Sequence, residues 1–126
     1  MRAKKPAPLR NMMMPETFYQ ELDPGIRFAV RVLHAGGFET CQSCQGGKGH
    51  AYFEPTIDLI ARDDDAIGFG ALATLRDYGL PLNGVAIVWP IANGQPYEKL
   101  WRVTFARTME ARADDRPIFI CSYQAQ

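Results

Sequence analysis

Two cysteines, a glycine-rich loop and a histidine occur together in one short stretch of the sequence. The stretch reads FETCQSCQGGKGHAYFEPT, and it contains Cys41, Cys44 and His50. Thiolates, imidazoles and unobstructed backbone amides are the groups that form metal sites, thiol active sites and anion-binding loops in proteins. The residue types therefore point to chemistry at this stretch, and their spacing has to decide which kind.

A metal site would combine Cys41, Cys44 and His50, because imidazoles and thiolate pairs separated by two residues are common zinc ligands. A closed structural site needs a fourth ligand, and the sequence brings neither His34 nor Cys121 close to the other three. In an extended strand the two cysteines also point to opposite faces. A redox-active pair is favoured even less, since such pairs begin a helix and this one follows a helix. We therefore expect no metal and no other cofactor.

A thiol-dependent enzyme is the alternative that Cys44 and His50 suggest. Cys44 ends a predicted strand just before a turn, so His50 can return across the turn as a base for the thiol. Glu54 or Asp58 would then orient the imidazole. Free cysteines are more commonly small buried hydrophobic residues than nucleophiles, and that structural interpretation of Cys44 stays open.

A pocket for a small anionic, nucleotide-like ligand is the leading interpretation from the sequence. Three glycines let backbone amides converge on an anion without obstruction by side chains, and nearby polar side chains add donors. A simple turn needs fewer glycine and polar residues than this stretch contains. The predicted ligand-binding residues are Thr40, Ser43, Cys44, Gly46, Gly47, Lys48, His50 and Glu54.

Hydrophobic periodicity and turn residues predict the elements that position this stretch. The fold class is α+β, with two helices packed on one face of a mainly antiparallel four- to five-stranded sheet in the order α-β-β-α-β-β. The predicted elements are a helix over 24–35, strands over 38–44 and 55–61, a helix over 66–78, strands over 85–92 and 99–106, and a short final strand over 116–123.

Local signals fix several details of these elements. Asp23 is expected to cap the first helix, because aspartate is a favoured cap and Pro24 suits the first helical position. Strand alternation places Phe38, Thr40, Gln42 and Cys44 on one face of their strand, and Glu39, Cys41 and Ser43 on the other. The Asn93-Gly94 pair marks a hairpin, although the expected loop is longer than two residues.

Length and composition bound the function classes. A chain of 126 residues fits one domain, which we place over 16–126 after a flexible basic, proline-containing arm over 1–15. Fourteen basic residues balance fourteen acidic ones, so no net charge draws the protein to nucleic acid or to an anionic membrane, and binding of nucleic acid would need a local basic patch. No apolar run suits a membrane helix or a signal peptide, and three cysteines favour a reducing cytoplasm. The oligomeric state does not follow from the sequence.

The pattern GFETxxSCxGGxGHAxxEPT, continued by YGLP, VWPIANGQP and WRVTF, resembles a group of small proteins carried by bacteriophages and prophages. The resemblance spans Arg27 to Phe105. It implies a phage-borne cytoplasmic protein and implies no activity. In that setting, inhibition of a host protein is a further alternative, through the basic arm or the tryptophan-containing hairpin.

A shorter likeness involves the segment from Thr40 to Gly46. Its sequence, TCQSCQG, is similar to the T-x-S-S-C-S-G-R strand and loop of the tRNA wybutosine-synthesis methyltransferase family, although the arginine is missing. This likeness implies a pocket for a nucleoside or for S-adenosylmethionine beside Cys44.

Overall fold

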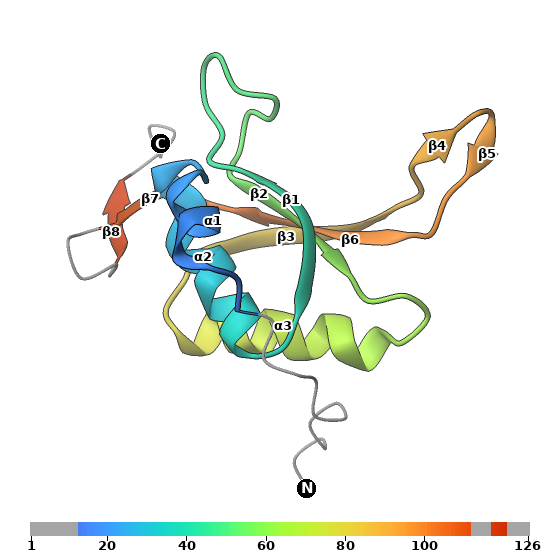
Figure 1. Ribbon diagram of the computed structural model, residues 1–126, viewed down its shortest axis with the longest axis horizontal. Coiled ribbons are helices and arrows are strands. Elements are labelled where there is room, and N and C mark those ends of the chain that lie inside the picture. The colour runs from blue at the N-terminus through green and yellow to red at the C-terminus, as the bar shows by residue number, and fades with distance from the viewer. Residues whose placement is uncertain (1–12, 112–116, 121–126) are drawn as a thin grey trace, which may run out of the picture.

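A four-stranded antiparallel sheet and two helices form the body of the protein (Figure 1). The computed structural model describes residues 13–111 and 117–120. The sheet order is β1-β2-β6-β3, formed by Glu39–Cys44, Thr56–Ile60, Leu100–Phe105 and Leu82–Val88. Helix α2 spans Pro24–Ala35 and helix α3 spans Asp65–Asp77. The predicted α+β class is therefore confirmed.

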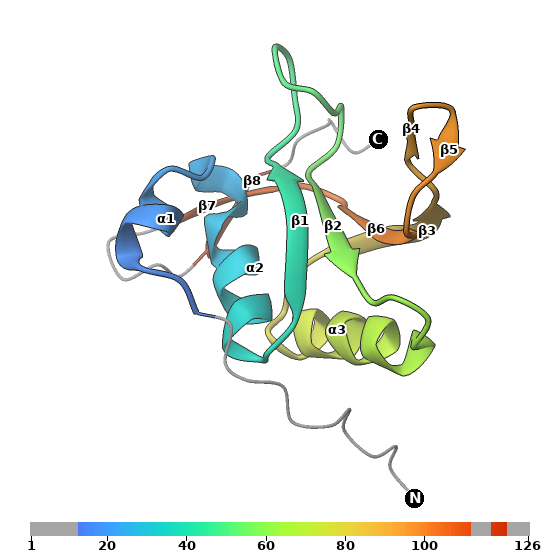
Figure 2. The same ribbon diagram turned by 45° about the vertical axis from the view of Figure 1, so that its right-hand side comes forward.

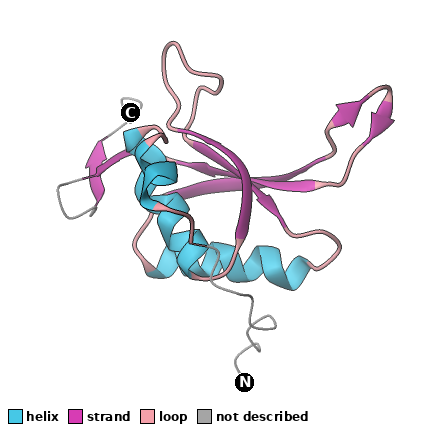
Figure 3. Ribbon diagram, in the orientation of Figure 1, coloured by secondary structure: helices cyan, strands magenta, loops and turns pink. Residues whose placement is uncertain are grey.

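Smaller elements surround this body, and the sequence order predicted for the chain did not include all of them. A short helix, α1, covers Glu16–Gln20, and two ribbons lie outside the main sheet (Figure 3). One ribbon pairs β4, Ile91–Ala92, with β5, Gln95–Pro96. The other pairs β7, Thr108–Ala111, with β8, Pro117–Ile120. The predicted final strand is thus present as β8, in a separate two-stranded sheet.

The core lies between the helices and one face of the sheet. Figure 2 shows α2 alongside β1, with α3 across the end of the sheet. Strands β2 and β6 point alternate side chains at the helices, and these side chains are almost fully buried: Ile57, Leu59, Trp101, Val103 and Phe105. Helix α3 approaches the sheet closely because Gly68 has no side chain there; a Cβ atom at Gly68 would lie 2.5 Å from indole carbons of Trp101.

Helix α2 ends in the motif that its glycine pair predicts. Gly37 adopts a φ of 87°, a conformation that glycine adopts without steric cost. The amide of Gly37 donates to the carbonyl of His34, and the amide of Phe38 donates to the carbonyl of Leu33, each at 2.9 Å. These two bonds turn the chain directly from α2 into β1. The start of β1 is therefore fixed by the end of the helix.

Strand β1 contains a β-bulge at Cys41, which changes the faces that simple alternation predicted. Thr40 lies opposite Leu59, whereas Gln42 lies opposite Asp58. Because Asp58 and Leu59 are consecutive residues of β2, their partners lie on opposite faces of the sheet. The prediction that Thr40 and Gln42 share a face was therefore wrong.

The edge of the sheet also differs from the sequence expectation. Asn93 and Gly94 both have positive φ values, 53° and 75°, and they form a two-residue turn between β4 and β5. The longer loop that we expected is therefore replaced by the tight turn that Asn-Gly favours. Pro90 divides the predicted strand over 85–92 into β3 and β4, and β3 is an edge strand of the main sheet, a position at which a proline is tolerated.

Part of the predicted arm over 1–15 and Cys121 lie outside the described residues. Of the arm, only Met13 to Pro15 can be placed, and the amide of Met14 donates to the hydroxyl of Tyr19 at 3.0 Å. Within the described part of the chain, no helix combines the length and the apolar character that crossing a membrane requires.

Candidate functional site

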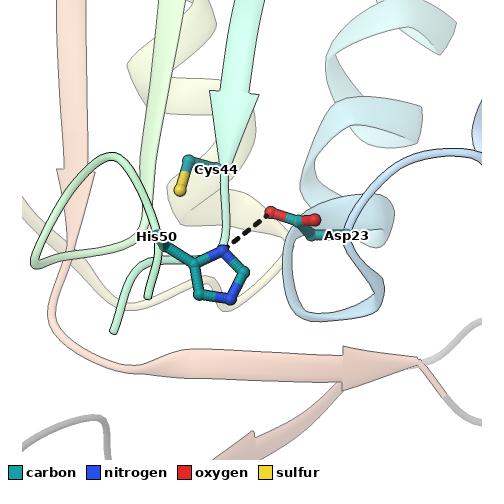
Figure 4. Close-up of side chains that lie close together, drawn as sticks. All are labelled: Asp23, Cys44 and His50. Atoms are coloured by element: carbon teal, nitrogen blue, oxygen red, sulfur yellow. Dashed lines mark ion pairs between the residues drawn. The ribbon is translucent and has the colours of Figure 1, made fainter. Parts of the chain in front are cut away.

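Three side chains from separate parts of the chain converge where β1 ends (Figure 4). Asp23 directly precedes α2, Cys44 is the last residue of β1, and His50 lies in the loop between β1 and β2. A carboxylate oxygen, the sulfur and a ring nitrogen of these residues all lie within 4.8 Å of one another. The structure therefore brings together Cys44 and His50, as predicted, and adds a carboxylate.

Both ring nitrogens of His50 have polar neighbours. Nδ1 lies 3.5 Å from the Oδ2 atom of Asp23, and Nε2 lies 3.3 Å from the side-chain nitrogen of Gln45. The sulfur of Cys44 accepts a hydrogen bond from the amide of Gly46 at 3.4 Å. Cys44 is only 6% exposed, while His50 and Asp23 reach the solvent. Of the three side chains, the Cys44 thiol is therefore the one that is shielded from solvent.

Asp23 is available for this cluster because Gln45 takes over its expected capping role. The Asp23 side chain makes no capping hydrogen bond to α2. Instead, the side-chain oxygen of Gln45 accepts from the amide of Gly25 at 2.7 Å, in the first turn of the helix. In exchange, the amide of Gln45 donates to the carboxylate of Asp23 at 3.1 Å. This exchange joins the start of α2 to the end of β1.

The loop after Cys44 is folded tightly at Gly46. This residue has a φ of 80°, and a Cβ atom there would lie 2.4 Å from the carbonyl carbon of Glu54 and 2.5 Å from the nitrogen of Pro55. The amide of the next residue, Gly47, donates to the carbonyls of Tyr52 and Phe53 at 3.1 and 2.9 Å. Glycine at position 46 is therefore required both by its backbone conformation and by the close approach of the returning chain.

Tyr52 anchors the same loop to the sheet face that the helices leave open. Asp58 is fully buried on that face and accepts from Arg102 through two bonds, of 2.9 and 3.0 Å. Gln42 donates to Asp58 at 2.7 Å and to the hydroxyl of Tyr52 at 2.6 Å. The guanidinium of Arg102 lies 5.0 Å from the centre of the Tyr52 ring. The hydrogen bond to Asp58 also raises the pKa of Arg102, so the guanidinium stays charged.

The converging amides predicted for an anion pocket are mostly used within the loop. The amides of Gln45, Gly46 and Gly47 all donate to protein acceptors, and the amide of His50 donates to the carbonyl of Gly47 at 3.1 Å. Among the described residues, the side chain of Lys48 is exposed and makes no hydrogen bond or ion pair. Anion binding by this loop stays a prediction, but its main donors are already engaged.

The other predicted ligand-binding residues lie apart from the cluster. The hydroxyl of Thr40 lies 3.0 Å from the Nε2 atom of His34, in the layer between α2 and the sheet. Ser43 lies opposite Ile57 in the sheet and is half-buried. The Glu54 carboxylate accepts from the side chain of Asn83 at 3.5 Å. Within the described residues, none of these three side chains makes a hydrogen bond or ion pair to Cys44 or His50.

The possible metal ligands also differ from those that the sequence suggested. Among the described residues, the cluster contains Asp23 in place of Cys41, which is exposed on the bulge. His34 is buried and bound to Tyr19 and Thr40 at 2.8 and 3.0 Å, so it is no fourth ligand.

The carboxylate beside His50 is Asp23, whereas Glu54 and Asp58 were expected. Sequence reasoning missed Asp23 because its Asp-Pro pair already had a sufficient explanation as a helix start.

Comparison of the chain with family models, curated proteins and solved structures finds no match. The resemblances to phage proteins and to the wybutosine-synthesis family therefore stay predictions. The function has to be inferred from the geometry of the cluster.

Proposed function

We propose that the protein is a thiol-dependent enzyme in which Cys44 is the nucleophile, His50 is the base and Asp23 orients the imidazole. The observation that carries this proposal is the convergence of a sulfur, a ring nitrogen and a carboxylate oxygen within 4.8 Å from three separate segments. A nucleophile, a base and a group that orients the base are the three parts that covalent catalysis by a thiol requires.

The contacts suggest how each residue contributes. His50 takes the proton from the sulfur of Cys44, and the Asp23 carboxylate stabilises the imidazolium that forms. The amide of Gly46, which donates to the sulfur, stabilises the thiolate. The distance from sulfur to ring nitrogen shortens when substrate binds, as catalytic hydrogen bonds commonly do.

The reaction class that fits these groups is transfer of an acyl group. The thiolate forms a bond to a carbonyl carbon of the substrate, and the leaving group departs with the proton that His50 holds. Water then attacks the thioester, His50 accepts a proton from that water, and the sulfur leaves as the restored thiol. No oxidant or reductant is consumed in either step.

Cys41 provides an internal control for a test of thiol activation. It lies on the same strand and is exposed, whereas Cys44 is buried. If accessibility alone decides the rate, limiting iodoacetamide at pH 7 alkylates Cys41 first. If the cluster activates its thiol, Cys44 reacts first despite its burial, since the thiolate is the reactive form. Tandem mass spectrometry of the peptide that contains both cysteines measures the two rates.

Variants of the cluster then separate activation from mere exposure. His50→Gln and Asp23→Asn should both slow alkylation of Cys44 and leave the rate at Cys41 unchanged. Lys48→Gln is the matched control, because it removes an exposed charge from the same loop without touching the cluster. The proposal is overturned if Cys44 reacts more slowly than Cys41 and its rate is the same in all three variants. A ligand that binds less tightly to Lys48→Gln would instead support the anion-binding interpretation.

Binding of a host protein is a second candidate function, and the edge of the sheet favours it. Strand β3 and the ribbon beyond it expose four large apolar side chains: Val85, Ile87, Trp89 and Ile91. An edge strand can pair with a strand of a partner protein, and apolar side chains then add to the contact. A partner captured from host lysate should be lost with Ile87→Lys, and the purified pair should show the same difference. If the unmodified protein and Ile87→Lys capture the partner equally well, this function is contradicted.

A further inference from the structure

We propose that Asp23, Cys44 and His50 form a binding site for Zn²⁺, and that zinc bound there switches off the thiol chemistry of Cys44. The first part depends only on the positions of the three side chains. The second part rests on the proposed enzymatic function. Neither part uses Cys41, the cysteine that the CxxC pattern suggested as a ligand.

The spacing of the donor atoms suits a tetrahedral ion. Metal–ligand bonds of about 2.0–2.3 Å place neighbouring ligand atoms about 3.3–3.8 Å apart in a tetrahedral zinc site. The three donor atoms here lie within 4.8 Å of one another, so small movements are enough to close the site. His50 can make such a movement, because it lies in an exposed part of the loop. Cys44 and Asp23 are held in place by the amides of Gly46 and Gln45.

The kinds of donor atom favour zinc over the hard cations. A thiolate is a soft ligand that selects zinc and related transition metals, whereas calcium and magnesium require mainly oxygen ligands. The cluster offers one sulfur, one nitrogen and one carboxylate. Three protein ligands leave a fourth position for water, on the side where Asp23 and His50 reach the solvent.

The surrounding contacts resemble the outer shell of a metal site. An amide donates to the Cys44 sulfur and another donates to the Asp23 carboxylate, which are the kinds of contact that hold metal ligands in place. Zinc on Nδ1 of His50 would move the ring proton to Nε2. The Gln45 oxygen stays bound to the amide of Gly25, so the His50 ring has to turn its protonated Nε2 away from the Gln45 side-chain nitrogen, which lies 3.3 Å away in the metal-free protein.

Coordination and catalysis compete for the same electron pairs. Zinc bound to the sulfur takes the lone pair with which Cys44 would attack a carbonyl carbon. Zinc bound to Nδ1 of His50 also keeps the ring proton on Nε2, so neither ring nitrogen is left to accept a proton from the thiol. Removing the metal frees both groups at once. Zinc is therefore a reversible inhibitor of the proposed reaction.

Calorimetry with zinc chloride and absorption spectroscopy with Co²⁺ test the metal site directly. We expect one ion per chain and a thiolate-to-cobalt charge-transfer band. Cys44→Ser should abolish the band, and Asp23→Asn and His50→Gln should weaken binding of both ions. Cys41→Ser and Cys121→Ser are the controls and should behave as the unmodified protein does. Absence of saturable binding, or loss of the band in Cys41→Ser with retention in Cys44→Ser, overturns the site.

Alkylation with and without zinc tests the switch. With free zinc at 100 times its Kd, about 1% of the sites are unoccupied, so alkylation of Cys44 should slow about 100-fold. Alkylation of the exposed Cys41 should not change. Zinc that binds with the expected stoichiometry but leaves the rate at Cys44 unchanged overturns the switch.

The two experiments also separate the failure of one proposal from the failure of the other. If zinc binds at the cluster but Cys44 is sluggish in the metal-free protein, the metal site stands and the thiol-dependent function falls. If Cys44 is fast but zinc does not bind, the function stands and the metal site falls.

Discussion

Replacing Arg102 by glutamine should cost about 3 kcal/mol of stability, because it leaves the buried carboxylate of Asp58 without its charged partner. Asp58 is 0% exposed, and Arg102 supplies two of its three side-chain hydrogen bonds. Breaking a buried ion pair by removing one member typically costs about 3–5 kcal/mol. The side chain of Arg102 is 29% exposed, so water can replace part of the lost interaction and the lower end of that range applies.

The corresponding shift in melting temperature follows from the length of the chain. An unfolding entropy of about 2.1 cal/mol/K per residue gives about 0.26 kcal/mol/K for 126 residues. A loss of about 3 kcal/mol therefore lowers Tm by about 11 °C. Differential scanning calorimetry and urea unfolding measure the two quantities independently.

Arg62→Gln is the matched control for this prediction. Arg62 is 57% exposed and lies 3.5 and 3.8 Å from the carboxylates of Glu39 and Glu98. Exposed ion pairs of this kind contribute about 0–1 kcal/mol. If Arg102→Gln costs no more than Arg62→Gln, the buried charge is not the source of the effect.

A double-mutant cycle with Asp58→Asn decides the same question more sharply. Removing both charges should destabilise the protein less than the sum of the two single changes, by about 2–3 kcal/mol, because no unpaired charge is left in the interior. Additive single effects would refute the reasoning. Arg102→Gln also removes the contact between the guanidinium and the Tyr52 ring, which helps to hold the loop. Alkylation of Cys44 should therefore slow in this variant.

Three further predictions concern the loop, a buried histidine and a helix cap. Gly46→Ala should cost about 2–4 kcal/mol in urea unfolding, and Gly49→Ala only about 1, because a Cβ atom meets backbone at the first position and open space at the second; equal costs would contradict this. Burial lowers the pKa of His34 below its ordinary 6.5, so the unfolded chain binds a proton at this residue more readily than the folded chain does. The free energy of unfolding should therefore fall as the pH drops below about 6.5. If His34→Gln loses as much stability over the same pH range, His34 is not the source of the fall. Asp64→Ala should lower stability by about 1 kcal/mol, because Asp64 accepts from the amide of Ala66 at 3.0 Å, and an unchanged Tm would show that this cap is dispensable.

The helices and strands could be predicted because their signals are local. Pro24 and the glycine pair at 36 and 37 mark the two ends of α2, and Asp64 marks the start of α3. In the predicted strand over 55–61, alternation places Ile57 and Leu59 on one face, and both are buried in the core. The glycine pair and Asp64 are satisfied by residues within five positions in the chain. No knowledge of the tertiary structure is needed to use them.

The features that shape the site are not local, and the sequence does not reveal them. The bulge places one extra residue, Cys41, in β1 opposite β2. Whether a bulge forms depends on how the two strands pair, and a cysteine at this position does not indicate one. Alternation therefore failed from Cys41 onward. A non-local contact also occupies a donor of the expected amide cradle, since the carbonyls of Tyr52 and Phe53 return to the loop and accept the amide of Gly47.

Asp23 shows most clearly how tertiary contacts assign a role that local rules give to another residue. An aspartate before Pro24 is expected to cap its own helix, and a capping carboxylate would not be available to His50. Gln45, distant in the chain, caps the amide of Gly25 instead, and its own backbone amide holds the Asp23 carboxylate toward the cluster. The position of the carboxylate beside His50 therefore depends on the contact between the start of α2 and the residue that follows β1. A change at Gln45 should disturb the helix start and the cluster together, although its side chain is neither a nucleophile nor a base.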